Sequence, residues 1–277
     1  MTEKLAKLNL LIERLAQSSS ADFYQELSEQ TRQLGGIKST DDLGSLPQTS
    51  AAALAAVPLL ERQYTSNDGY VKKIGRGTGH FLIKRTLADL GQEDFRMADC
   101  RRPLVLLSDN GEACEKVFWF FEKNILALPG EPNNLKVTAQ ASVQYGIDSI
   151  FTEVKIAEKF LPILSQIYDP AEVKKTVLLG DHFNAGVWDS VSGIKGLELI
   201  LALPETGPFA SACPEALAKQ KLVFHPESNS LLELTDQLIV SRLILLPTPI
   251  IRYETGLITG RVGNKCECAI RDSFILR

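Results

Sequence analysis

Residues 103–151, PLVLLSDNGEACEKVFWFFEKNILALPGEPNNLKVTAQASVQYGIDSIF, decide the fold that the sequence predicts. Short apolar runs of strand length alternate here with segments of helix length, and the alternation continues to residue 203. A parallel strand is buried on both faces and needs a crossover element, so this rhythm predicts an α/β fold: a mostly parallel sheet covered by helices. The expected strands are 104–107, 125–128, 149–151, 176–179 and 197–203, and the expected helices are 112–123, 134–145 and 154–167.

The two ends of the chain have patterns of their own. Leucine and isoleucine recur at helical spacing in residues 5–15, and a second helical stretch, 21–34, ends on Gly35 and Gly36, which suits a left-handed C-cap. These stretches predict an N-terminal helical hairpin. After Gly207, short β-rich pieces broken by prolines predict a smaller antiparallel β part. We therefore expect three parts: 1–64, helical and packed on the core; 65–207, the α/β core; and 208–277, a β-rich subdomain.

Composition and charge narrow the classes of partner. The chain has 277 residues, 44% hydrophobic and 23% charged, with a net charge of −4 and scattered basic residues. Since no basic cluster suits a phosphate backbone, nucleic acid is not an expected partner. The most apolar stretches, 51–60 and 238–246, fall short of the roughly 20 residues of a membrane span, so no membrane contact is expected. The N-terminus lacks the pattern of a signal peptide, and a cytoplasmic protein is the expectation.

Several segments resemble the signatures of one family. Residues 246–256, LPTPIIRYETG, are similar to the Pro-Leu-Ile-Arg-Tyr-Arg-Thr-Gly-Asp motif of the adenylate-forming ligases of the phenylacetate-CoA ligase type. Upstream, residues 203–208, LPETGP, and 212–215, ACPE, are similar to that family's Tyr-Gly-Ser-Thr-Glu-x-Gly-Pro and Glu-Cys-Pro-Glu, in the same order. Residues 145–148 and 176–181 resemble its strand entry Tyr-Gly-Val-Thr and its adenine-side loop. Together these segments identify the chain as resembling that family.

The resemblance spans residues 65–277 and implies a function. Members of the family bind ATP or AMP with Mg²⁺ and a small carboxylic acid, which they activate for transfer to coenzyme A. The end of the chain, 272–277, is similar to the family's hinge, so we expect the small mobile C-terminal domain to be missing. In the family that domain carries an adenylation-assisting lysine and excludes water, so a separate protein that supplies it is an expected partner. A homodimer, common among relatives, is a further expectation.

A glycine-rich stretch stands where the family has its phosphate loop. It reads GRGTG, and the nucleotide contacts implied there are Gly75, Gly77, Thr78 and Gly79. The backbone N–H groups of such a turn can wrap an anion, and the Thr78 hydroxyl adds a donor. A plain turn without a ligand is the alternative interpretation.

Further contacts of the nucleotide site come from the resemblance alone: Gly180, Asp181, Glu205, Arg252, Tyr253 and Thr255. Glu205 stands where the family places a glutamate that holds Mg²⁺ against the ATP phosphates, a role for a hard oxygen ligand. Leu257 replaces the Asp that accepts hydrogen bonds from the ribose hydroxyls, at a cost of roughly 1 to 3 kcal/mol for each lost partner. The departures fall on nucleotide contacts, whereas the motifs that shape the fold remain.

A set of thiols and one imidazole resembles a zinc site carried by some members of the family: Cys213, His225, Cys266 and Cys268. Five cysteines, an odd number, do not suggest a disulfide framework, and the close pair Cys266 and Cys268 suggests a metal first. Three thiolates and one imidazole make a closed tetrahedral Zn²⁺ site of the structural type, which would pin the β-rich part to a chain end. Isolated core cysteines with a surface histidine are the alternative.

Two functional hypotheses follow. The first is a truncated, degenerate member of the ligase family that binds a carboxylic acid beside Tyr145 and Gly146, together with ATP or AMP, and has little or no ligase activity alone. The second is a non-catalytic small-molecule-binding or interaction module on the same scaffold. The sequence has no Ser-His-Asp order and no dinucleotide fingerprint, so hydrolase and dehydrogenase functions have no support.

Overall fold

The computed structural model describes residues 1–17, 24–64, 70–76, 79–85, 100–183, 191, 194, 196–244, 246–261, 266, 268 and 273–276. The chain divides into two compact units. Unit 1 comprises Met1–Asp89, Leu203–Ala210 and Phe224–Arg277, and unit 2 comprises Leu90–Ala202 and Ser211–Val223. These boundaries differ from those of the three expected parts, because the N-terminal helices and most of the β-rich segment fall in one unit.

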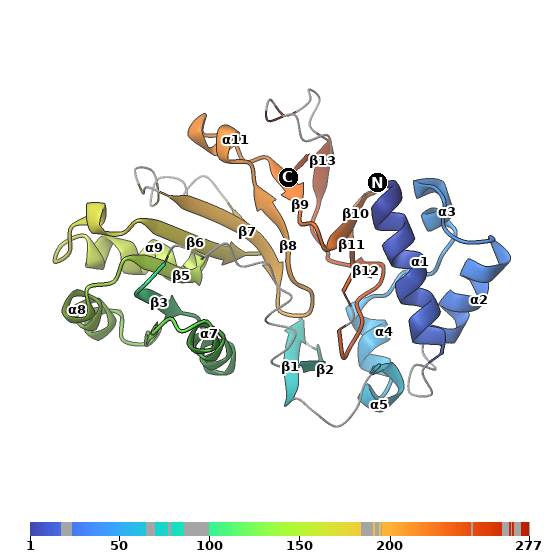
Figure 1. Cartoon of the computed structure of the whole chain (residues 1–277), viewed down its shortest axis with the longest axis horizontal. Coiled ribbons are helices and arrows are strands. Elements are labelled where there is room, and N and C mark those ends of the chain that lie inside the picture. The colour runs from blue at the N-terminus through green and yellow to red at the C-terminus, as the bar shows by residue number, and fades with distance from the viewer. Residues whose placement is uncertain are drawn as a thin grey trace. The chain divides into compact units, whose positions relative to one another are not determined.

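Unit 2 is built on parallel strands in the order β7-β6-β5-β3-β4. Helices connect consecutive strands, α7 after β3, α8 after β4 and α9 after β5 (Figure 1). The bounds are β3 Pro103–Leu106, α7 Asn110–Glu122, β4 Leu128–Pro129, α8 Leu135–Tyr145, β5 Ser149–Glu153, α9 Val154–Leu164, the 3-10 turn Pro170–Glu172, β6 Lys175–Gly180 and β7 Leu197–Leu203. The predicted parallel sheet is confirmed, and the expected strand 125–128 is shorter and begins later.

Both faces of this parallel sheet are covered by helices. One core contains Trp119 and Phe120 of α7, packed with alternate strand residues such as Val105. The other contains Phe160 of α9 and, from β3 again, Leu104. Successive side chains of a strand point to opposite faces, so every residue of β3 is buried on one side or the other. The continuous apolar run that predicted a buried strand has this physical cause.

Unit 1 joins residues from both ends of the chain in one hydrophobic core. Helices α1 (Thr2–Ala16) and α2 (Gln25–Gln33) form the predicted helical hairpin, and α3 (Thr40–Gly44) follows. The buried leucines of α1 pack with Leu231 and Leu243 from the β-rich part, and Lys4 Nζ donates to the backbone oxygens of Glu227 and Ser230 at 2.9 and 2.7 Å. This packing places the N-terminal helices and the segment Phe224–Arg277 in the same unit.

The remaining elements of unit 1 are short. Helices α4 (Ala51–Ala56) and α5 (Leu59–Arg62) precede the antiparallel hairpin of β1 (Tyr70–Arg76) and β2 (Gly79–Arg85). A second small antiparallel sheet has the order β10-β11-β12, with bounds Ser230–Leu234, Leu238–Arg242 and Tyr253–Glu254. The latter sheet confirms the predicted antiparallel part.

Not all of the C-terminal strands join that small sheet. β8 (Gly207–Ala212), β9 (Phe224–Pro226), β13 (Thr259–Arg261) and β14 (Phe274–Leu276) extend the main sheet, which has the order β13-β14-β9-β8-β7-β6-β5-β3-β4. Only three residues join β7 to β8, a connection that antiparallel neighbours allow and parallel ones do not. The nine-stranded sheet is therefore mixed.

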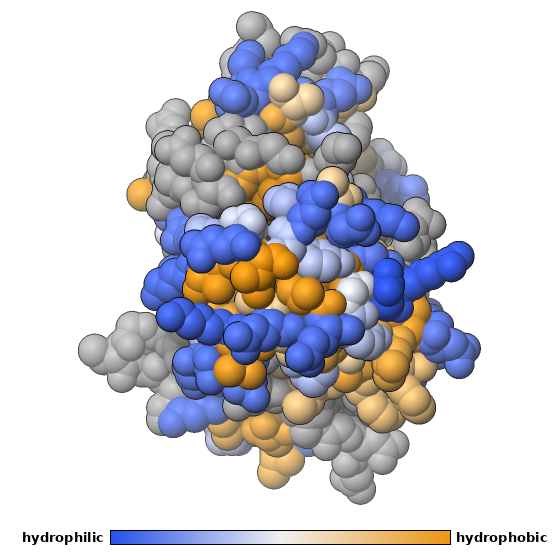
Figure 2. All heavy atoms as spheres, turned by 90° about the vertical axis from the view of Figure 1, so that its left-hand side faces the viewer, coloured by the Kyte–Doolittle hydropathy of each residue, from blue (hydrophilic) through white to orange (hydrophobic). Residues whose placement is uncertain are grey.

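The surface of α7 carries exposed aromatic side chains. Phe118 and Phe121 are 44% and 65% exposed, with ring centroids 6.1 Å apart. Figure 2, which turns the left-hand side of Figure 1 toward the viewer, shows apolar residues gathered between hydrophilic ones.

In the part of the chain that the structure describes, no helix has the length and hydropathy needed to cross a membrane.

Candidate functional site

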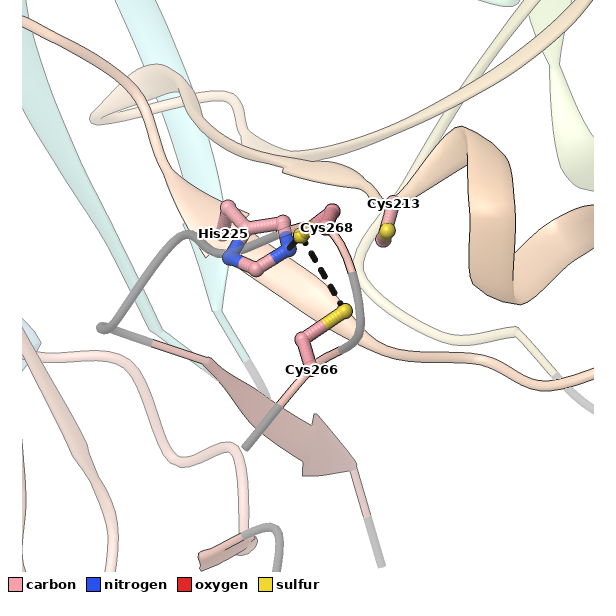
Figure 3. A group of neighbouring side chains, drawn as sticks. All are labelled: Cys213, His225, Cys266 and Cys268. Atoms are coloured by element: carbon pink, nitrogen blue, oxygen red, sulfur yellow. Dashed lines mark hydrogen bonds between the residues drawn. The ribbon is translucent and has the colours of Figure 1, made fainter. Parts of the chain in front are cut away.

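The structure brings the four predicted metal ligands together. One ligand atom each of Cys213, His225, Cys266 and Cys268 lies within 4.8 Å of the others (Figure 3). The sulfur of Cys268 is 3.1 Å from His225 Nε2 and 3.2 Å from the sulfur of Cys266. Segments that are far apart in the sequence therefore meet at one point.

Strand pairing explains this meeting. His225 lies in β9, and Cys213 directly follows β8, the neighbour of β9 in the sheet. The Cys213 N–H donates to the Val223 oxygen at 2.7 Å, which closes the excursion that contains α11 (Pro214–Ala218). Cys266 and Cys268 belong to the connection between β13 and β14, and β14 pairs with β9. The residues between Cys213 and His225 thus form a short excursion from the sheet that contains one helix.

The donor set fits zinc. Zn–S bonds are about 2.3 Å and Zn–N bonds about 2.0 to 2.1 Å, so the sulfurs of a tetrahedral site lie about 3.8 Å apart. The observed spread of 4.8 Å and the two closer contacts bracket that value, so small side-chain rotations suffice. Soft thiolates and an imidazole suit Zn²⁺ and do not suit Ca²⁺ or Mg²⁺, which prefer oxygen ligands. Cys213 and His225 are 0% and 6% exposed, as a closed structural site requires.

The glycine-rich stretch lies in the β1–β2 hairpin. Gly75 is opposite His80, and Gly79, the first residue of β2, is opposite Arg76. Gly77 and Thr78 lie outside the described residues. The backbones of Gly75 and Gly79 therefore belong to an antiparallel strand ladder, and the role of this stretch in binding a nucleotide stays a prediction.

Glu205 lies in the tight turn that joins β7 to β8, and it is 1% exposed. The Thr206 N–H donates to the Leu203 oxygen at 3.1 Å, and the Thr206 hydroxyl donates to the Gly207 oxygen at 2.9 Å. Gly207 has a φ of 65°, in the left-handed region that favours glycine. This turn holds the Glu205 carboxylate away from solvent.

Arg252 is engaged inside the protein. Its guanidinium donates from Nε and Nη2 to the two carboxylate oxygens of Glu233, at 2.9 and 2.8 Å, and from Nη1 to the backbone oxygen of Leu46. The Arg252 side chain is 1% exposed and that of Glu233 is 10% exposed. A buried bidentate pair of this kind fixes geometry, so Arg252 ties the small sheet to the N-terminal segment.

Other residues of the signature segment, residues 246–256, also form hydrogen bonds and strand pairs within unit 1. Tyr253 is buried in β12, where its backbone pairs with Val240. The Thr255 hydroxyl donates to the Leu238 oxygen at 2.7 Å and accepts from the Leu257 N–H at 3.1 Å. The Leu257 oxygen in turn accepts from the Leu238 N–H at 2.8 Å. These bonds close a turn, so Thr255 and Leu257 have a structural role in the fold.

Two predicted parts of the ligand site lie at opposite ends of the strands in unit 2. Gly180 and Asp181 stand at the carboxyl end of β6, whereas Tyr145 and Gly146 end α8, just before β5 begins. β5 and β6 are parallel, and five residues of strand span about 16 Å. In addition, Tyr145 donates its hydroxyl to the Leu126 oxygen at 2.5 Å, and burial raises its pKa. The two pairs therefore lie at different ends of these strands, and the role of each in binding a ligand stays a prediction.

Sequence reasoning missed residues at the carboxyl edge of unit 2. Ser108, just after β3, donates from its N–H and its hydroxyl to Glu153 Oε1 at 2.7 and 2.6 Å. Glu153 ends β5, the neighbour of β3 on the side away from β4. The strand order therefore reverses between β3 and β5, and ligands of open α/β sheets bind outside the carboxyl ends at such a point. The signal in the sequence was a polar residue at the end of each apolar run.

Glu233 was also missed. It is the one charged residue in β10, Ser-Leu-Leu-Glu-Leu, and an isolated carboxylate in an apolar strand calls for a buried partner. The sequence offers several basic residues, and only the register of β10, β11 and β12 selects Arg252.

Comparison with solved structures identifies the fold. A 2-hydroxyisobutyryl-CoA ligase in complex with 2-HIB-AMP and CoA superposes with a TM-score of 0.72 and 14% identity, over 98% of this chain and 72% of that chain. The chain has the fold of the adenylate-forming ligases. The NpsA N-terminal subdomain of Klebsiella oxytoca, with anthranilyl-AMSN, gives 0.53 and 12% identity over 79% of this chain and 68% of that one. The Bacillus subtilis O-succinylbenzoate CoA synthetase MenE, with AMP, gives 0.52 and 8% over 74% and 48%.

The similarity is one of fold. The chain spans 65% of the same 2-hydroxyisobutyryl-CoA ligase in its postadenylation state, in complex with R3-HIB-AMP. No protein-family model matches the sequence, and no curated protein is significantly similar to it. The expected relationship to the adenylate-forming fold is thus confirmed at the level of structure.

Proposed function

We propose that this chain is a carboxylic-acid-binding protein of the adenylate-forming fold, with little or no ligase activity alone and with a structural Zn²⁺. The proposal rests on the hydrogen bonds that the signature segment, residues 246–256, makes within the protein. Arg252 and Thr255 hydrogen-bond within the protein, beside Leu257 in place of the expected aspartate. The segment therefore supports the fold without depending on a nucleotide.

We expect this chain to bind nucleotides weakly. The Nε, Nη1 and Nη2 atoms of Arg252 already donate to protein acceptors, so recruiting the guanidinium to a phosphate would leave Glu233 and Leu46 without those bonds. The Leu257 side chain cannot accept from a ribose hydroxyl. Each buried hydroxyl without a partner costs about 1 to 3 kcal/mol, or about tenfold to a hundredfold in affinity.

We place the acid at the carboxyl edge of the parallel strands in unit 2. Three strand ends meet there: Ser108 follows β3, Glu153 ends β5 and Gly180 ends β6. At Gly180 a Cβ would lie 3.0 Å from Val154 Cγ2, so a side chain there would crowd the edge. The similar solved structures hold acyl or aryl adenylate ligands and their analogues, which supports an organic acid as the ligand class.

The proposed zinc has a structural role. It would be held by Cys213, His225, Cys266 and Cys268, and it would link the end of β8, β9 and the β13–β14 connection through coordinate bonds. Because only the folded state binds the metal, the free energy of metal binding adds to the free energy of unfolding. The site offers four protein ligands and no open position, which suits a structural ion and not a catalytic one.

A second candidate function is a working core of an adenylate-forming ligase. Glu205 favours it, because its carboxylate is buried in the turn where the family places its Mg²⁺ ligand. In that case the chain would bind ATP with Mg²⁺, and this binding would need the carboxylate of Glu205.

Calorimetric titration with ATP and Mg²⁺ tests the two candidates on zinc-analysed protein. The variants are Glu205→Ala and, as a matched control, Glu61→Ala at an exposed position. We expect no saturable binding below the millimolar range in any of the three proteins. Micromolar binding that Glu205→Ala abolishes and Glu61→Ala retains would replace the binding-protein proposal with the ligase core.

A further inference from the structure

Cys266 and Cys268 form a close thiol pair inside the proposed zinc centre, on which this inference rests. One residue separates them in the sequence, and their sulfurs are 3.2 Å apart. A disulfide bond is about 2.05 Å long, so the sulfurs need to approach by only about 1 Å. The sulfur of Cys268 is also 3.1 Å from His225 Nε2, so it contacts both the second thiol of the pair and the imidazole.

The ligands differ in their exposure to solvent. Cys266 and Cys268 are half-buried, whereas Cys213 is 0% exposed and His225 is 6% exposed. Oxidation of cysteine is selective for accessible thiolates that have a second thiol nearby. A small oxidant therefore reaches the Cys266–Cys268 pair before it reaches Cys213.

We propose that Cys266 and Cys268 form a peroxide-sensitive switch whose oxidation to a disulfide releases the zinc. One thiolate of the pair attacks hydrogen peroxide, which breaks the O–O bond and gives a sulfenic acid and hydroxide. The second thiolate attacks that sulfur, forms the S–S bond and expels hydroxide. Two thiolates lose two electrons in total, the peroxide is reduced, and two protons from solvent convert the hydroxides to water.

Loss of two ligands leaves one thiolate and one imidazole, too few for a structural Zn²⁺ site. The disulfide joins residues separated by a single position, a short and strained ring, and strained disulfides are readily reduced. Dithiothreitol with added Zn²⁺ therefore restores the reduced, metal-bound form.

Release of the zinc affects the β13–β14 hairpin first. The cysteine pair lies in its connection, and β14 is held on β9 by the pairing of Phe274 with Phe224, whose ring centroids are 5.9 Å apart. Without the metal, the link from Cys266 and Cys268 to His225 of β9 is lost, and this short pairing remains between β14 and β9. We therefore expect faster cleavage by trypsin after Arg261, the last residue of β13, once the zinc is released.

The test uses the full chain, with zinc measured by elemental analysis before treatment. Hydrogen peroxide is added, released zinc is followed with a metal-binding dye, and the cysteines are mapped by mass spectrometry. Trypsin places both cysteines in one peptide, residues 266–271, CECAIR. We expect loss of bound zinc together with a CECAIR peptide lighter by two hydrogen atoms, and recovery of both with dithiothreitol and Zn²⁺.

Variants separate the pair from other thiols. Cys114→Ser removes an exposed cysteine outside the group and should leave zinc release unchanged. Cys213→Ser should still give the oxidised CECAIR peptide, even where its zinc affinity is reduced, and this readout does not need the metal. Three outcomes would overturn the switch without contradicting the zinc centre. The protein could keep its zinc under peroxide, or it could release the zinc with Cys213 in a disulfide. It could also release the zinc with a sulfinic acid in place of the Cys266–Cys268 disulfide. Absence of zinc from the reduced, remetallated protein would instead overturn the centre itself.

Discussion

Removal of the Glu233 carboxylate alone should destabilise the protein more than removal of Glu233 and Arg252 together. Arg252 is 1% exposed and donates to both oxygens of Glu233 at 2.9 and 2.8 Å. In Glu233→Leu the guanidinium stays buried without its counter-ion. In the double variant Glu233→Leu, Arg252→Met, both charges of the pair are removed.

The magnitude follows from desolvation. Breaking a buried pair by removing one partner costs about 3 to 5 kcal/mol, whereas apolar replacement of both partners is often neutral. The double variant also loses the bond from Arg252 to the Leu46 oxygen, an unsatisfied acceptor that costs about 1 to 3 kcal/mol. We therefore expect Glu233→Leu to be about 2 kcal/mol less stable than the double variant, and the coupling energy between Glu233 and Arg252 to exceed that difference.

Urea unfolding of the two single variants and the double variant measures this coupling as a double-mutant cycle. The exposed pair Lys7 and Glu3 on α1 is the matched control, and we expect far weaker coupling there because solvent screens it. A coupling between Glu233 and Arg252 no larger than in the control would refute the buried ion pair. It would also return Arg252 to the set of residues available for a ligand.

Further predictions concern acid stability, a glycine and the metal. Burial acts to raise the pKa of Asp148, but hydrogen bonds from the backbone N–H groups of Arg102 and Arg101 outweigh it and hold the pKa below its ordinary value. The lowered pKa stabilises the folded state above the ordinary aspartate pKa of about 3.9, and this stabilisation is lost as the pH falls through the lowered value. The free energy of unfolding, measured from acid to neutral pH, should therefore depend less on pH in Asp148→Asn than in the unmodified protein. Gly196→Ala should cost more than about 1 to 3 kcal/mol, because φ is 62° and the new Cβ would lie 2.2 Å from a backbone oxygen, whereas Gly44→Ala, with nothing within 4 Å, should be tolerated in thermal melts. Chelation of zinc should lower the melting temperature, since a metal at a thousand times its Kd contributes about 4 kcal/mol; an unchanged melt of zinc-loaded and chelated protein would argue against a structural ion.

Most of the α/β part was predictable because its signals are local. The run from Pro103 to Leu107 is apolar without interruption, which a parallel strand buried on both faces requires, and each following segment has helical length. The capping residues Asp109 and Asn134 accept from backbone N–H groups in the first turns of α7 and α8, so these helix starts are encoded locally as well.

The rest of the fold depends on contacts between distant segments. The packing of α1 against Leu231 and Leu243 has no local signature, since an amphipathic helix shows that it needs an apolar partner but not which one. The strands β9 and β14 are three residues long, too short for a pattern of alternation, so their place in the main sheet was not foreseen. The four metal ligands were grouped by their resemblance to a zinc site of the family, and the structure brings them together, whereas the pairing of Glu233 with Arg252 needed the register of the small sheet.

Release of pyrophosphate tests the proposed function most directly. Zinc-loaded protein is incubated with ATP, Mg²⁺ and a panel of small aliphatic and aromatic carboxylic acids, and pyrophosphate is followed with a coupled assay, with Glu205→Ala measured in parallel. We expect no acid-dependent release above the buffer rate, together with acid binding detected by thermal shift. Acid-dependent turnover that Glu205→Ala abolishes would contradict the proposal and establish the chain as a working adenylate-forming enzyme.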